Sequence, residues 1–77
     1  MWVIVLFDLP VNSKKRRKDY ALFRKGLKRL GFTMMQFSVY LRPCASREQA
    51  ETQVKRVKDL LPGRGEVRIL QITDKQF

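Results

Sequence analysis

Six apolar residues stand in a row from Trp2 to Phe7, and this run limits the possible folds more than any other feature of the sequence. It is rich in β-branched and aromatic residues and ends before Pro10, so it predicts a short strand. Successive side chains of a strand point to opposite faces of the sheet. Both faces of this strand are therefore apolar: Val3, Val5 and Phe7 on one, and Trp2, Ile4 and Leu6 on the other.

An amphipathic helix is predicted over residues 14–30. Its apolar residues recur at steps of three and four, which places them on one helix face: Tyr20, Phe23, Leu27 and Leu30. Asn12 or Ser13 is a candidate N-cap, and Gly31 stands where a left-handed C-cap is expected.

A second helix is predicted after the Ser-x-x-Gln pattern of Ser46 and Gln49, which is typical of a capping box. Its apolar positions again have helical spacing: Ala50, Val54, Val57 and Leu61. Pro62 and Gly63 end this helix. Between the helices, residues 32–36 and 38–42 predict two short strands that meet near Phe37, and residues 66–73 predict the last strand.

The predicted order is β-α-β-β-α-β, the ferredoxin-like split unit, an α+β fold with a four-stranded antiparallel sheet and two helices on one face. The 77 residues form a single domain, residues 1–77. A domain this short buries only about 60% of the surface that its unfolded chain exposes. Cys44 is the only cysteine, so an internal disulfide is excluded.

Two features predict a homodimer. Two helices on one side of the sheet leave the second apolar face of the first strand without cover. In the last strand, Val67 and Ile69 alternate as expected, but Leu70 and Ile72 continue on the opposite parity. This change of phase predicts a β-bulge, or a segment that leaves its own sheet for another. A loosely covered sheet in a monomer is the alternative.

The charge of the chain predicts a polyanionic partner. Lys and Arg number 17 against 7 Asp and Glu, which gives a formal charge of +10. Nucleic acid is expected ahead of an anionic membrane surface or a merely solvated basic face. With no histidine, Ser-His-Asp and Cys-His sites are excluded. The apolar opening is too short to span a bilayer, and one cysteine suits a reducing compartment, so we expect a cytoplasmic protein without a membrane partner.

Candidate nucleic-acid-binding residues are concentrated on the first helix. Five cations follow one another over residues 14–18, where the helix dipole disfavours positive charge. This placement indicates that they hold a phosphate backbone, with the amides of the helix start as additional donors. The candidates are Lys14, Lys15, Arg16, Arg17, Arg24, Lys28 and Arg42, with weaker support for Arg64 and Arg68.

Asp8 is the candidate catalytic and metal-binding residue. It follows the apolar run directly, at the mouth of a strand-to-helix loop. An Asp before Leu-Pro is more often a turn former. Magnesium takes oxygen ligands and is often held by one or two carboxylates, so a single Asp per subunit could suffice if a two-fold axis brings two copies together. The other acids are expected to face solvent, and none pairs obviously with Asp8.

Aromatic side chains form a further group that could contact nucleic acid. Tyr20, Phe23, Phe32 and Phe37 could stack on bases, but we expect all four in the core. RNA-recognition domains with this strand order carry a characteristic aromatic string on the third strand, and no such string occurs here.

Short segments along nearly the whole chain form a specific set. They are residues 3–11, Phe23-Arg24-Lys25, Gly31-Phe32, Met35-Gln36, Ser38-Val39-Tyr40, Leu61-Pro62 with Gly65, and Ile72-Thr73 with Lys75-Gln76-Phe77. This set resembles the small CRISPR-associated endonuclease that partners the CRISPR integrase in spacer acquisition.

The resemblance implies a ferredoxin-like homodimer whose C-terminal strand exchanges onto the other subunit's sheet. It implies that Asp8 binds Mg²⁺ between the protomers, and that members cut single-stranded RNA or double-stranded DNA, although some do not cut. It also implies that the dimer bridges two integrase dimers on foreign DNA.

We therefore predict a magnesium-dependent endonuclease of spacer acquisition that acts on RNA or double-stranded DNA, with the CRISPR integrase as its partner. Water activated at the metal would attack the phosphate. Because the sequence offers no evident general base, a non-catalytic DNA-binding scaffold of the same complex is the alternative. An unrelated basic RNA-binding ferredoxin-like module is the third.

Overall fold

The apolar run that opens the chain forms β1 (Trp2–Asp8), an inner strand of the sheet. The computed structural model describes residues 1–63 and 65–73. Arg64, a weaker candidate for nucleic-acid binding, and residues 74–77, which include the last of the family-like segments, lie outside the described residues. The other elements are α1 (Lys14–Arg29), β2 (Thr33–Gln36), β3 (Val39–Pro43), α2 (Arg47–Asp59) and β4 (Glu66–Ile72).

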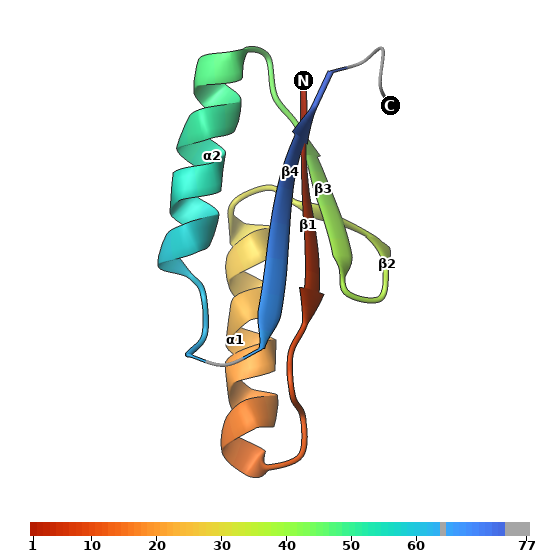
Figure 1. The fold of residues 1–77 in the computed structure, drawn as a ribbon, viewed down its shortest axis with the longest axis vertical. Coiled ribbons are helices and arrows are strands. Elements are labelled where there is room, and N and C mark those ends of the chain that lie inside the picture. Colours follow the sequence, from red (N-terminus) through yellow and green to blue (C-terminus); the bar gives the residue numbers. More distant parts are fainter. Residues whose placement is uncertain (64, 74–77) are drawn as a thin grey trace.

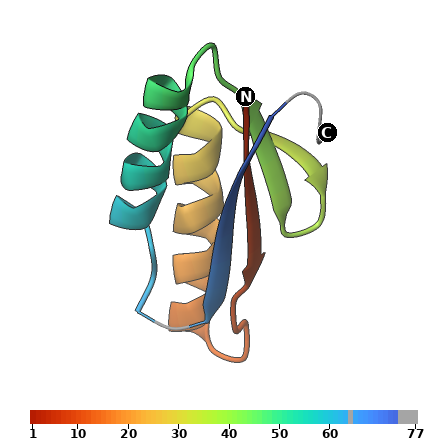
Figure 2. The same cartoon turned by 45° about the horizontal axis from the view of Figure 1, so that its top comes forward.

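The four strands form one antiparallel sheet in the order β2-β3-β1-β4. Figures 1 and 2 show α1 and α2 side by side on one face of this sheet. The predicted ferredoxin-like arrangement is confirmed. Among the described helices, neither combines the length and the apolar character that crossing a membrane requires.

Helix α1 has the two caps that its sequence predicts. Ser13 is the N-cap, and its Oγ accepts a hydrogen bond from the Arg16 backbone N–H at 3.2 Å. After the helix, Gly31 adopts a φ of 92°, a left-handed conformation that glycine tolerates. The N–H groups of Gly31 and Phe32 donate to the carbonyls of Lys28 and Leu27, both at 3.0 Å. This pair of bonds is a Schellman motif, which satisfies the last carbonyls of the helix.

Helix α2 also begins as predicted, but it ends at Asp59, two residues earlier than the apolar spacing suggests. The Ser46 Oγ accepts from the Gln49 N–H at 3.2 Å, and the Gln49 Oε1 accepts from the Ala45 N–H at 2.6 Å. The expectation that Leu61 packs on this helix is wrong, because the helix is capped at Leu60 and Leu61 is exposed beyond it. Leu60 packs against the core instead.

The helix-covered face of the sheet holds the core. Val3 and Val5 are fully buried, and Phe7 is nearly so. The Phe7 ring contacts three other aromatic rings, with centroid distances of 5.1 Å to Phe23, 5.6 Å to Tyr40 and 5.7 Å to Tyr20. This cluster ties β1 and β3 to α1.

The opposite face of the sheet has no helix over it, and we call it the open face. It is made by alternate residues of three strands, most of them apolar: Trp2, Ile4 and Leu6 of β1, Val39 and Leu41 of β3, and Leu70 and Ile72 of β4. The predicted bulge in the last strand is wrong, because β4 pairs with β1 without interruption from Glu66 to Ile72 and stays in its own sheet over that length. Leu70 lies opposite Ile4, so the change of phase carries the apolar side chains of β4 from the core onto the open face.

The turn between β2 and β3 lies where the sequence predicts it. Gln36 pairs with Val39, which leaves Phe37 and Ser38 as a two-residue turn. The expectation that Phe37 packs in the core is wrong, because 82% of its surface is exposed. Phe32, by contrast, is buried as expected. β2 is an edge strand whose four residues are all exposed, so an apolar side chain in the turn that follows it finds no core to enter.

Candidate functional site

Asp8 is the last residue of β1, and its side chain is exposed. Val3, Val5 and Phe7 point toward the helices, so the alternation of the strand directs Asp8 to the open face. The residue therefore stands at the edge of an apolar surface, at the mouth of the loop that leads to α1 (Figure 1).

A second acid lies directly across from Asp8. Glu66, the first residue of β4, is its register partner, and it is exposed as well. Opposite side chains of an antiparallel pair have Cβ atoms about 5 Å apart. Glu66 was not predicted as a partner of Asp8, although the order of the strands indicates it. Glu66 opens a strand that runs antiparallel to β1, and the end of one strand then meets the start of the other.

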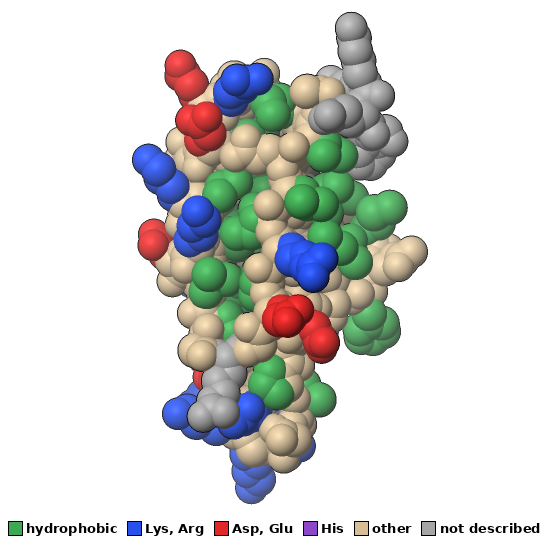
Figure 3. All heavy atoms as spheres, viewed as in Figure 1, with side chains coloured by type: hydrophobic (Ala, Val, Ile, Leu, Met, Phe, Trp, Pro, Cys, Tyr) green, Lys and Arg blue, Asp and Glu red, His purple; other side chains and the backbone are tan. Residues whose placement is uncertain are grey.

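A cation completes this end of the open face. Arg68 lies opposite Leu6 in β4, two residues after Glu66 and on the same side of the sheet. Figure 3 shows acidic side chains gathered over the lower part of the sheet, beside a basic side chain and amid hydrophobic ones. An anionic group held near the acids would therefore have a guanidinium within reach.

The chemistry of Asp8 and Glu66 fits a divalent cation. Two carboxylates that face each other repel, and a cation between them relieves the repulsion. Their oxygens are the ligands that Mg²⁺ prefers. Within residues 1–63 and 65–73, no three His, Cys, Asp or Glu side chains come together as a possible metal site. One copy of the chain thus supplies a pair of carboxylates here.

The predicted basic residues of α1 are largely free to meet a ligand. Lys14, Lys15 and Arg17 are exposed in the first turn of the helix, as are Arg24 and Lys28 further along it. The first turn contains no acid. The Arg17 guanidinium donates to the Val11 carbonyl at 3.2 Å, which steadies the loop before the helix.

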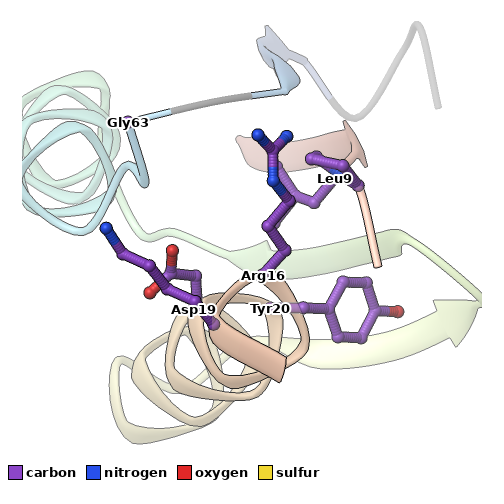
Figure 4. A pocket seen from close by; sticks show the side chains of 7 residues that line it. Leu9, Arg16, Asp19, Tyr20 and Gly63 are labelled. Carbon is purple, nitrogen blue, oxygen red and sulfur yellow. The ribbon is translucent and has the colours of Figure 1, made fainter. Parts of the chain in front are cut away.

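Arg16 is half-buried, in contrast to these exposed cations, and it lines a hollow at the start of the helix. The hollow has a volume of about 340 Å³ and is bounded by Leu9, Pro10, Lys15, Arg16, Asp19, Tyr20 and Gly63. In Figure 4 the Arg16 side chain rises from α1 between Leu9 and Gly63, while Asp19 and Tyr20 lie at the base. The acid Asp19, expected to face solvent, is half-buried here.

The structure does not bring all the predicted site residues together. The end of β1 and the first turn of α1 are joined by a short loop (Figure 1), but the alternation of β1 directs Asp8 away from the helices. Arg42 lies opposite Val3 on the helix-covered face, half-buried, with its Nε close to Gly31 at the far end of α1. Its Nη1 is buried and finds no hydrogen-bond partner among the described residues. Arg42 is thus apart from the cations of the first turn.

Comparisons with known proteins agree with the resemblance noted in the sequence. The family model described as CRISPR associated protein Cas2 matches residues 1–77. A protein of Parvibaculum lavamentivorans named CRISPR-associated endoribonuclease Cas2 is 61% identical over 77 residues, which span all of this chain and 76% of the relative. Proteins of the same name from Flavobacterium psychrophilum and Paracidovorax avenae are 52% and 51% identical over the whole chain, covering 67% and 71% of their own lengths. The chain therefore belongs to the Cas2 family of CRISPR-associated proteins.

Proposed function

We propose that this protein is a metal-dependent endonuclease of CRISPR spacer acquisition, which cuts a phosphodiester bond of RNA or double-stranded DNA at a site centred on Asp8. The observation that carries the proposal is the exposed pair of Asp8 and Glu66 at the end of two neighbouring strands, in a chain of formal charge +10. The names of the relatives, CRISPR-associated endoribonuclease Cas2, support the same activity.

Asp8 and Glu66 are the residues that would hold Mg²⁺. When bound, the ion supplies an activated water and offsets the charge that develops on the phosphate. The carboxylates would hold the ion at the end of β1, and Arg68 on the same side of the sheet would attract the phosphate. Both carboxylates are exposed in a single copy of the chain, so a second copy packed over the open face would be needed to exclude water and strengthen these charge interactions.

A homodimer would form through the open face. A small monomer would expose this contiguous apolar patch to water, which is unfavourable. The open face of a second copy would bury it in a symmetric interface. A two-fold axis near Asp8 would place a second Asp8 beside the first and complete a site that one copy supplies only in part.

The first helix would hold the nucleic-acid backbone. Lys14, Lys15 and Arg17 are exposed in its first turn, and Arg24 and Lys28 extend the row along the helix. The free amides at the helix start add donors for phosphate oxygens. In a dimer two such rows would be available, which suits a role in bridging the CRISPR integrase on a DNA duplex.

A non-catalytic scaffold is the second candidate, and one observation favours it. The α1 cations and Asp8 lie on different sides of the sheet, so a duplex could be held along α1 without reaching the carboxylates. The two candidates differ in whether Asp8 is needed once the nucleic acid is bound.

A cleavage assay separates them. Labelled single-stranded RNA and duplex DNA are incubated with and without Mg²⁺, and the wild type is compared with Asp8→Ala and Asp8→Asn. Glu51→Gln, which removes an exposed carboxylate of α2, is the matched control. We expect magnesium-dependent cleavage by the wild type and by Glu51→Gln and none by either Asp8 variant. All four proteins should still bind the nucleic acid. Cleavage that persists in both Asp8 variants, or no cleavage of any substrate by the wild type, would exclude it.

A further inference from the structure

The turn between β2 and β3 displays a large aromatic side chain in solvent. Phe37 is 82% exposed, more than any other large hydrophobic residue described, and Met35 beside it is 59% exposed. Turns are normally made by small or polar residues, because they gain nothing from an apolar side chain that cannot be buried. Hydrophobic side chains also protrude where Figure 1 draws this turn (Figure 3).

The turn is fixed beside the proposed catalytic pair. Val39 pairs with Leu6, and the Phe7 N–H donates to the Ser38 carbonyl at 3.0 Å. The pairing of β3 with β1 ends there, and the turn that carries Phe37 leaves β3 at the end of β1 that Asp8 occupies. Glu66 lies opposite Asp8 on the other side of β1, so the turn and the two carboxylates share one end of the sheet. Figure 1 shows the turn, the end of β1 and the start of β4 at the same end.

The backbone of the turn is also unusual. Ser38 adopts a φ of 62°, a left-handed conformation that glycine or asparagine normally supplies at this place of a turn. Ser38 is small and polar, as is usual in turns, but a serine is uncommon in this left-handed conformation. The hydrogen bond from Phe7 holds the strained residue, and Phe37 is presented on a stiff support.

We propose that Phe37 is a stacking platform for an unpaired nucleobase of a single-stranded nucleic acid whose backbone passes Asp8; the proposal rests on the function proposed above. An aromatic ring stacks on any base, whatever its sequence. Bases inside a duplex are already stacked and paired, whereas those of a single strand can turn toward the protein. Because the turn and the carboxylates share one end of the sheet, a single strand that passes Asp8 can bring a base to the ring.

The positive charge of the molecule favours this occupant over an apolar protein segment. The backbone of a single strand is drawn to a chain of charge +10, and Arg68 offers a phosphate contact on the same side of the sheet. The platform also predicts a preference between substrates. Single strands should gain from Phe37, and duplexes should not.

Binding assays in EDTA test the platform without depending on cleavage. The full chain and Phe37→Ala are titrated against a labelled single-stranded oligonucleotide, as RNA and as DNA of the same sequence, and against the corresponding duplex. Met35→Ala, an exposed apolar neighbour in the same hairpin, is the matched control. We expect Phe37→Ala to weaken single-strand binding by about fivefold to a hundredfold, with duplex binding and the control unchanged. Phe37→Tyr should restore the affinity.

A second arm identifies the contact itself. Single abasic positions are introduced along the oligonucleotide, and one of them should weaken binding to the wild type but not to Phe37→Ala. Equal single-strand affinity of wild type and Phe37→Ala would overturn the platform, even if the wild type cleaves RNA. A Phe37→Ala chain that falls from dimer to monomer would also overturn it, because Phe37 would then belong to the subunit interface. Conversely, a chain that cleaves nothing but shows the expected binding pattern keeps the platform and loses the proposed nuclease.

Discussion

Tyr40 illustrates how a single buried residue can carry an unsatisfied group. It is fully buried between the sheet and α1, and its hydroxyl has no hydrogen-bond partner among the described residues. Burial raises the pKa of Tyr40 because the charged form would lose its hydration; the charge of Arg24 opposes this, and Tyr20 adds to it. The folded state thus binds the phenolic proton more tightly than the unfolded state does. The resulting stability is present below a pH of about 10 and is lost as the pH rises through the folded pKa.

Tyr40→Phe removes the unsatisfied hydroxyl while keeping the ring. We expect the free energy of unfolding at pH 7 to stay the same or to rise by up to about 1 kcal/mol, and the loss of stability above pH 10 to diminish. Urea unfolding at pH 7 and at a pH above 10 measures both effects, and Tyr20→Phe, at a half-buried neighbour, is the comparison. A fall in stability of more than about 1 kcal/mol at pH 7 would mean that the hydroxyl has a partner after all.

Among the elements, the loop before β4 holds Glu66 against Asp8. Gly65 has a φ of 101°, and a Cβ built there would lie 2.8 Å from the Asp8 carbonyl oxygen. Gly63 in the same loop has open space around it and does not adopt a left-handed backbone conformation. We expect Gly65→Ala to lower the free energy of unfolding by more than about 1 kcal/mol and to reduce cleavage, with Gly63→Ala close to wild type. Equal effects of the two substitutions would show that the loop does not depend on this close approach.

Helix α1 is the element on which nucleic-acid binding should depend. If about six phosphates are neutralised, affinity for a duplex should fall roughly a thousandfold between 50 and 200 mM salt. Charge reversal at Lys14, Lys15 and Arg17 should weaken binding and flatten that dependence. The matched control reverses Lys55 and Arg56, exposed cations of α2. Titrations at several salt concentrations measure the slope, and an unchanged slope for the α1 variant would place the binding face elsewhere.

The elements show where sequence patterns suffice and where they do not. Both helices follow from local rules, since Ser13, Gly31 and Ser46 cap them through bonds to near neighbours. The juxtaposition of Asp8 and Glu66 is not local, because it requires the register of strands far apart in the chain. Phe37 was misjudged because its aromatic character predicts burial, whereas its place in a two-residue turn prevents it.

For the whole molecule, the open face governs assembly. Leu70 of the edge strand β4 is 45% exposed on this face, and a charge there would have to be buried by a second copy. We expect the wild type to sediment as a dimer and Leu70→Lys as a folded monomer. Leu22→Lys is the control, because Leu22 is 56% exposed on α1, away from that face. A wild type that is monomeric at micromolar concentration, or a Leu70→Lys chain that remains dimeric, would remove the open face as the interface.

The proposed function depends on a divalent-cation site that the carboxylates at the end of β1 form and a second copy of the chain completes. Electron paramagnetic resonance with Mn²⁺, which shares the preference of Mg²⁺ for oxygen ligands, counts bound ions directly. We expect one bound ion for every two chains in the wild type, none at this site in Asp8→Asn, and the wild-type number in Glu51→Gln. If Asp8→Asn binds Mn²⁺ as well as the wild type does, or if the wild type shows no specific Mn²⁺ binding, the carboxylates at the end of β1 do not form this site.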